Sequence, residues 1–369
     1  MNKNLTTKEI FALALENHQK NNLDVAINFY NQVLEKEPNH QRAHNNLGVA
    51  FQVLKKYPKA RDCYKRAIEI NPRYVMAHNN LAKIFEKLEE KEKAINCYEK
   101  ASEIDPNFFD APYSLGKIFD KLKQYQKAVI YFEKAIEINP NHESTLCSLG
   151  MVFQTIGEET KAKSCYEKTI KINPNNTTAL NNLALSLKNL GDYKRAKECY
   201  ENVINIDSKF IYAYWGLHGC ASDIDEALLV LKRLYKVGNR DISLKIMLSV
   251  LQGFKGDFND FNDLLKKSDV NHPYIKSAQW VFSQPKLPRI YFKKADFFNS
   301  AIKLSENSRP FYEFGVWRGN SFKYLINTYK KGFGFDTFTG LPEKWSDSQP
   351  IGTYSSYGVV PKIDGGEFI

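Results

Sequence analysis

The residues best suited to chemistry lie near the end of the chain, in the stretch EFGVWRGNSFKYL. Residues 311–316 have the pattern of a short apolar strand with one carboxylate, Glu313, and Gly315 and Gly319 flank a tight turn after it. Ser321 opens an expected helix. Glycines allow a backbone to approach a ligand closely, and a helix N-terminus directs free amides at it. The order of these features predicts a ligand-binding turn between a strand and a helix.

A second expected strand, residues 332–335, ends at Asp336, which follows Glu313 by 23 residues. An acid at the end of this strand can accept hydrogen bonds from both hydroxyls of a ribose. The glycine spacing is not the GxGxxG of dinucleotide-binding proteins. The pattern predicts the start of a nucleotide-type α/β domain, although Glu313 could equally be a structural strand residue and Asp336 a loop cap.

The segments EFGVWRGNSFKYL and GFDTFTGLPEKW resemble the start of the macrocin O-methyltransferase-like family of class I methyltransferases. The resemblance implies S-adenosylmethionine as the cofactor and covers about the last seventy residues. It implies that Glu313, Gly315 and Gly319 surround the methionine part, with Ser321 at the helix start, Asp336 at the ribose, and Phe338, Leu341 and Pro342 near the adenine or the substrate. No catalytic residue or metal ligand can be assigned. We therefore expect the sequence to be the front part of a longer protein, without turnover as it stands.

The elements before this segment repeat every 34 residues, as the stretch from Gln41 to Pro72 shows most clearly. Within it, Leu47 and Gly48 share one face of a first expected helix, and Ala60, Tyr64 and Ala67 share one face of a second. Equivalent residues recur at Leu81, Leu115, Leu149 and Leu183, and at Tyr98, Phe132, Tyr166 and Tyr200. A period of this length predicts a helical solenoid.

These positions match the pattern of the tetratricopeptide repeat family, which the array resembles. We expect repeats at 7–40, 41–74, 75–108, 109–142, 143–176 and 177–210, and a degenerate seventh from Ile211. The resemblance implies a mainly α fold, a right-handed α-α superhelix whose first helices line a concave, peptide-binding groove. An incomplete α/β, Rossmann-like segment follows this superhelix in the expected fold.

Paired asparagines recur on the expected first helices, at Asn45 and Asn46, Asn79 and Asn80, and Asn181 and Asn182. An amide offers a donor and an acceptor together, so a row of amides can pair with an extended peptide backbone. The row is similar to the asparagine ladder of O-linked N-acetylglucosamine transferases, but Ser114 and Ser148 interrupt it. The alternative is that the asparagines only solvate the groove or cap turns.

The composition narrows the classes of partner and compartment. The net charge of +10 suits an acidic partner, but the lysines are spread over the repeats, so nucleic-acid binding is not expected. Four of the six cysteines, Cys63, Cys97, Cys165 and Cys199, share one repeat position and have no metal-ligand spacing. No signal peptide or membrane-spanning run is seen. We expect a cytoplasmic protein without a metal site.

The chain thus divides into a repeat array (1–240), a helical linker (241–294) and the start of a methyltransferase-like domain (295–369). The first hypothesis is a scaffold that binds a partner polypeptide in its groove. The second is a methyltransferase in the intact protein, whose repeats recruit the substrate. A third, a repeat-fused glycosyltransferase, rests only on the asparagine ladder.

Overall fold

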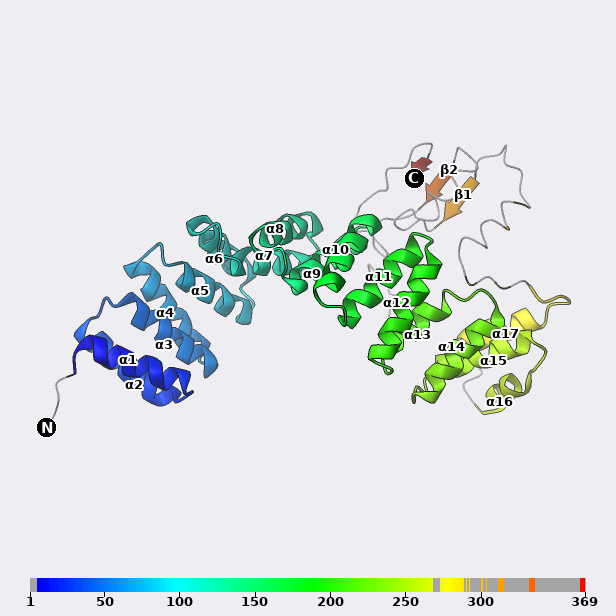
Figure 1. Cartoon of the computed structure of the whole chain (residues 1–369), viewed down its shortest axis with the longest axis horizontal. Helices are drawn as coiled ribbons and strands as arrows, with labels where there is room; N and C mark the ends of the chain where they lie inside the picture. Colours follow the sequence, from blue (N-terminus) through cyan, green and yellow to red (C-terminus); the bar gives the residue numbers. More distant parts are fainter. Residues whose placement is uncertain are drawn as a thin grey trace. The chain divides into compact units, whose positions relative to one another are not determined.

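The computed structural model describes residues 5–267, 273–288, 290, 292, 300, 303, 311–314, 332–335 and 366–368 (Figure 1). The chain divides into two compact units, Met1–Leu149 and Gly150–Ile369. Within the described ranges, no helix is both long and apolar enough to cross a membrane.

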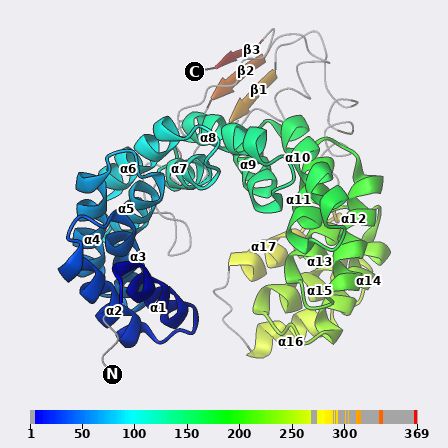
Figure 2. The ribbon, with the colours of Figure 1, turned by 60° about the vertical axis from the view of Figure 1, so that its left-hand side comes forward.

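The first unit is a series of helical hairpins. Its helices are α1 (Thr7–Gln19), α2 (Leu23–Lys36), α3 (Gln41–Val53), α4 (Tyr57–Ile70), α5 (Val75–Lys87), α6 (Lys91–Ile104), α7 (Asp110–Lys121) and α8 (Tyr125–Ile138). Helix α9 (Glu143–Thr155) contains the division between the units. In the first unit, α1, α3, α5 and α7 lie on one side, and α2, α4, α6 and α8 lie on the other (Figure 2).

The second unit continues with hairpins and then with helices outside the repeat register. These are α10 (Glu159–Ile172), α11 (Thr177–Asn189), α12 (Tyr193–Ile206), α13 (Ile211–His218), α14 (Ile224–Lys236), α15 (Ile242–Phe254), α16 (Asn259–Lys267) and α17 (Pro273–Phe282). Phe282 of α17 holds the last three together, since its ring lies 5.5 Å from Phe254, 5.1 Å from Phe258 and 5.0 Å from Phe261.

The helix boundaries follow the 34-residue period. The second helices α2, α4, α6, α8, α10 and α12 begin at Leu23, Tyr57, Lys91, Tyr125, Glu159 and Tyr193. Most first helices begin where the sequence places the start of a repeat, and α7 begins one residue later, at Asp110. The prediction of a mainly α-helical repeat array is confirmed.

Small residues let the two helices of a hairpin approach closely. A Cβ atom added to Gly48 would lie 2.7 Å from Cε1 of Tyr64, and one added to Gly116 would lie 2.6 Å from Cδ1 of Phe132. Real Cβ atoms do not tolerate such distances, so the aromatic ring occupies the space that a larger side chain would need. Gly48 therefore allows α3 and α4 to approach closely.

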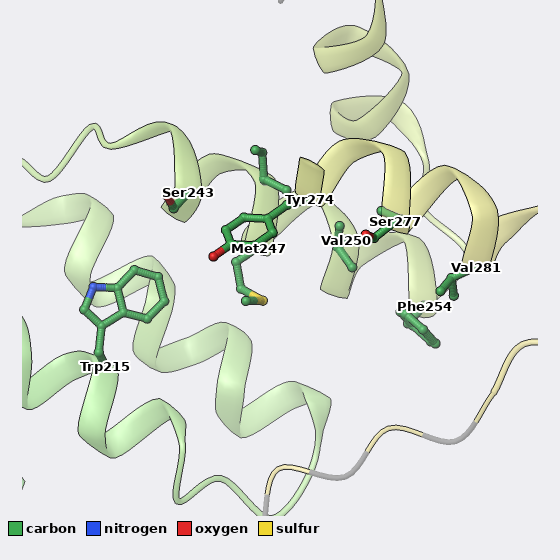
Figure 3. A pocket seen from close by; sticks show the side chains of 10 residues that line it. Trp215, Ser243, Met247, Val250, Phe254, Tyr274, Ser277 and Val281 are labelled. Atoms are coloured by element: carbon green, nitrogen blue, oxygen red, sulfur yellow. The ribbon is translucent and has the colours of Figure 1, made fainter. Parts of the chain in front are cut away.

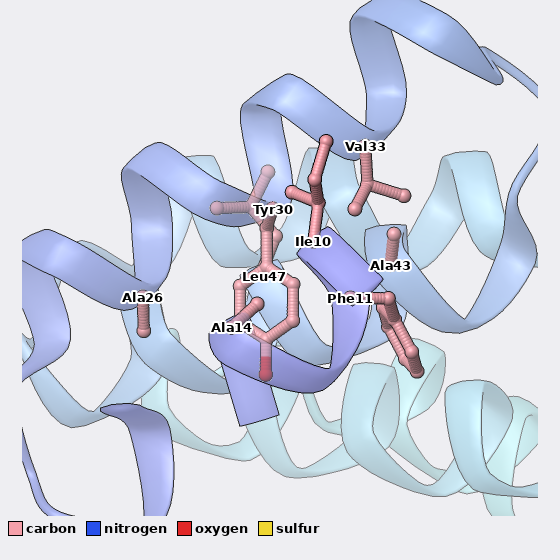
Figure 4. Packing of buried hydrophobic residues seen from close by; sticks show 8 residues of the cluster. All are labelled: Ile10, Phe11, Ala14, Ala26, Tyr30, Val33, Ala43 and Leu47. Atoms are coloured by element: carbon pink, nitrogen blue, oxygen red, sulfur yellow. The ribbon is translucent and has the colours of Figure 1, made fainter. Parts of the chain in front are cut away.

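The core runs between the hairpins, and Figure 4 shows its first part. This cluster consists of Ile10, Phe11, Ala14, Ala26, Tyr30, Val33, Ala43 and Leu47. Two of the buried tyrosines donate from their hydroxyls to a side chain twelve residues earlier, on the first helix: Tyr64 donates to Gln52 Oε1 at 2.8 Å and Tyr98 to Glu86 Oε1 at 2.5 Å. These bonds offset the loss of water around a buried hydroxyl.

Three short strands form a parallel sheet in the order β1-β2-β3: β1 (Phe311–Phe314), β2 (Gly332–Phe335) and β3 (Gly366–Phe368). The first two lie where the sequence places strands, although the expected first strand extended to residue 316. The third was not predicted, because three residues carry too weak a pattern. The helix expected after Ser321 lies outside the described residues, so the α/β segment remains a prediction.

Candidate functional site

The asparagines of α3 and α5 form a chain of amides between neighbouring first helices. Asn80 donates through Nδ2 to Oδ1 of Asn45 at 3.1 Å, and Asn45 donates in turn to Oδ1 of Asn46 at 3.1 Å. Asn46 is also hydrogen-bonded to the Tyr30 hydroxyl. Burial raises the pKa of this hydroxyl to about 12. Much of this polar set therefore stabilises the repeat interface.

Burial separates the four amides of α3 and α5. Asn45, Asn79 and Asn80 are only 4%, 1% and 9% exposed, whereas Asn46 is partly exposed. Neither Nδ2 nor Oδ1 of Asn79 has a hydrogen-bond partner among the described residues. As the hairpins stand, Asn46 is the member of this set that a bound backbone could reach.

In the second unit, Asn181 and Asn182 of α11 are both partly exposed. Asn181 donates to Oδ1 of Asn182 at 3.3 Å, and its own Oδ1 is shielded from water without a partner among the described residues. The pair thus resembles Asn45 and Asn46 in its internal bond but is less buried.

One of the two serines that interrupt the row, Ser114, has its own structural role. Ser114 hydrogen-bonds the Tyr98 hydroxyl from the following repeat, as Asn46 does for Tyr30. The repeat position therefore keeps a polar side chain that serves the buried tyrosine, and a serine suffices for that purpose. The sequence pattern alone could not show that a residue at this position also hydrogen-bonds a buried tyrosine.

Basic and aromatic side chains of α5 and α7 lie next to the surface that carries the amides. Lys83 forms an ion pair with Asp110 at 3.1 Å, and Lys117 lies 5.3 Å from the centre of the Tyr113 ring. The Lys117 side chain is exposed, as are those of Lys87 and Lys121, the last residues of their helices. This surface is polar and positively charged.

A pocket of about 450 Å³ lies in the second unit between α13, α15 and α17 (Figure 3). Its wall includes Trp215, Ile246, Met247, Val250, Phe254 and Tyr274. None of the lining residues is charged, and hydroxyl groups come from Ser243, Tyr274 and Ser277. The pocket suits an uncharged, largely apolar group. The sequence did not reveal it, because two of its three walls, α15 and α17, lie outside the 34-residue register.

The predicted cofactor residues are only partly covered. Glu313 lies in β1 and pairs with Gly334 of β2. Gly315, Gly319, Ser321 and Asp336, together with Phe338, Leu341 and Pro342, lie outside the described residues. The structure therefore does not test whether these side chains meet around one ligand.

Two of the repeat cysteines have weakly acidic thiols. Burial raises the pKa of both Cys63 and Cys97 to about 11, so these thiols stay protonated at neutral pH. No three His, Cys, Asp or Glu side chains gather as metal ligands among the described residues.

Comparison with known families finds tetratricopeptide repeats at residues 42–74, 75–108, 113–142, 143–176 and 165–198. Among solved structures, the C-terminal part of a repeat-containing protein from Cytophaga hutchinsonii aligns with a TM-score of 0.57 at 21% identity, over 64% of this chain and 99% of that one. YrrB, described as a repeat protein with an unusual peptide-binding site, aligns at 21% identity over 50% and 95%, with a TM-score of 0.46. MamA aligns at 24% over 46% and 92%, with a TM-score of 0.43. No curated protein matches the sequence.

Proposed function

Because residues 42–198 consist of tetratricopeptide repeats, we propose that the chain is an interaction scaffold whose first helices bind an extended segment of a partner polypeptide. Tetratricopeptide repeat proteins typically mediate protein–protein interactions. Repeats of this kind present a long surface built from equivalent side chains, and such surfaces are commonly used for binding.

The observation that carries the proposal is the partly exposed amide at one repeat position of α3 and α11, Asn46 and Asn182. Each amide can donate to a peptide carbonyl and accept from a peptide N–H. Behind these partly exposed amides lie the buried side chains of Asn45, Asn79 and Asn80. Asn181 donates a hydrogen bond to Asn182.

The test is the affinity of a peptide selected from a displayed random library against the full chain. Asn46→Ala and Asn182→Ala should each raise the Kd about threefold to tenfold, the effect of one lost hydrogen bond. Asn107→Ala, in the exposed turn before α7, is the matched control and should leave the Kd unchanged. An unchanged Kd in both site variants, with helical content intact, would contradict the proposal.

A second candidate function is an S-adenosylmethionine-dependent methyltransferase segment within residues 295–369. Supporting it is the parallel pairing of β1 with β2, the arrangement that a strand–helix–strand unit requires. When bound, the cofactor would supply an electrophilic methyl group; Glu313, Gly315, Gly319, Ser321 and Asp336 are the residues proposed to hold it. The repeats would then recruit the methyl acceptor.

Calorimetric titration with S-adenosylhomocysteine tests this second candidate. We expect saturable heat that Asp336→Ala removes and that Asp347→Ala, an acidic residue outside the motif, preserves. Absence of heat from a protein with a complete catalytic domain would refute the assignment.

The cytoplasmic location likewise remains a proposal, which fractionation of the native cell can check.

A further inference from the structure

Four lysines of the first unit stand at two repeat positions of neighbouring first helices. Lys83 and Lys87 lie one helical turn apart on α5, and Lys117 and Lys121 occupy the equivalent places on α7, 34 residues later. The ion pair between Lys83 and Asp110 shows that the two helices are adjacent at this surface. We call these four residues the lysine quartet.

The charges of the quartet are largely unneutralised. Lys87, Lys117 and Lys121 are exposed, and none of them has a described carboxylate oxygen within 4.0 Å. Three of the acids close by in sequence are engaged elsewhere: Asp110 pairs with Lys83, Glu86 accepts the Tyr98 hydroxyl, and Glu90 pairs with Lys93. Glu89 is exposed, but it lies two residues from Lys87 and so does not share its helix face. Asp120 is half-buried, and burial raises the pKa of its carboxyl group. A concentrated positive surface therefore remains available to a ligand.

The equivalent positions on α3 are apolar. Val49 and Val53 stand 34 residues before Lys83 and Lys87, and Val53 is 53% exposed. Met76, at the start of α5, adds another exposed apolar side chain. At these two repeat positions the side chains thus change from apolar on α3 to basic on α5 and α7, which gives the surface a direction.

We propose that the lysine quartet binds an acidic, extended polypeptide segment that carries an apolar residue beside its acidic run. The inference rests on the proposed scaffold function and names the class of partner. Helices in contact lie about 8–10 Å apart, and α5 and α7 meet through the ion pair between Lys83 and Asp110. A polyproline-II-like peptide returns to the same face every three residues, after roughly 9 Å. Acidic side chains three residues apart would therefore meet Lys83 and Lys117, or Lys87 and Lys121, in turn.

Fluorescence anisotropy with the full chain tests the proposal. The probe is a labelled dodecapeptide with glutamate at every third position and a leucine at one end; a second probe has glutamine in place of glutamate. We expect the acidic peptide to bind at least tenfold more tightly than the neutral one, and added salt to reduce the difference. Equal binding of the two probes would overturn the proposal.

Two charge-matched triple variants locate the site. Lys87→Gln, Lys117→Gln and Lys121→Gln together should raise the Kd of the acidic peptide about tenfold, the effect of roughly three exposed ion pairs. The control replaces Lys65, Lys134 and Lys168, exposed lysines of α4, α8 and α10, and should leave the Kd within about twofold. Equal weakening in both variants would show a general charge effect and overturn the assignment.

A single-stranded oligothymidylate of the same length provides the remaining comparison. Tighter binding of this probe than of the acidic peptide, lost in the quartet variant, would assign the surface to nucleic acid and overturn the proposal. The same measurements separate the two proposals. If the neutral peptide binds as well as the acidic one and Asn46→Ala weakens the binding of both, the scaffold proposal is supported and the proposal of an acidic partner is overturned.

Discussion

One repeat position, in the turn between the two helices of each hairpin, adopts a left-handed backbone conformation. It is occupied by Asn21, Lys55, Glu89, Lys123, Gly157 and Gly191, all with φ between 57° and 86°. A residue with a Cβ atom is strained there, whereas glycine is not. The first four hairpins therefore retain a local strain that the fifth and sixth have lost.

This position predicts opposite effects for two substitutions. Lys55→Gly should raise the free energy of unfolding by about 0.5–1 kcal/mol, because Lys55 is exposed and its strain is relieved. Gly191→Ala should lower it by about 1 kcal/mol, although a Cβ atom there would meet nothing within 4 Å. Urea unfolding monitored by circular dichroism measures both, and a destabilised Lys55→Gly variant would contradict the explanation.

At the scale of helices, a lysine near the start of four second helices, α4, α6, α8 and α10, lies over an aromatic ring of the first helix. The Nζ atoms of Lys59, Lys93, Lys127 and Lys161 lie 5.6, 5.6, 5.1 and 5.4 Å from the ring centres of Phe51, Phe85, Phe119 and Phe153. From the sequence, these lysines are expected only to recur with the repeat on solvent-exposed helix faces. Their contact could not be predicted, because it depends on how the helices cross.

Replacing one of these lysines tests whether the contact stabilises the hairpin. Lys127→Met keeps most of the apolar stem and removes the charge, so the free energy of unfolding should fall by about 0.5–1 kcal/mol. Lys134→Met, an exposed lysine of the same helix, is the control and should change it by less than about 0.5 kcal/mol. Equal urea midpoints for the two variants would exclude a specific contribution from Lys127.

Over the whole molecule, the sequence predicts the parts that repeat and little of the parts that do not. The hairpins follow from Leu47, Tyr64 and their equivalents, because most contacts of a repeat are local and recur with its period. The apolar pocket combines Trp215, Met247 and Tyr274 from three helices that share no period. The burial of Asn79 likewise depends on the neighbouring hairpin, which a single repeat cannot specify.

Nearest-neighbour packing predicts that damage to one hairpin stays local. Gly116→Val would force a side chain into the Phe132 ring, at a cost of about 1–3 kcal/mol. Hydrogen exchange should accelerate in α7, α8 and the hairpins next to them, while α13 and α14 keep their protection, because a repeat contacts mainly its neighbours in sequence. Adding Phe132→Leu should restore part of the protection by making room for the valine. A uniform loss of protection across all helices would instead show that the array unfolds as one cooperative block.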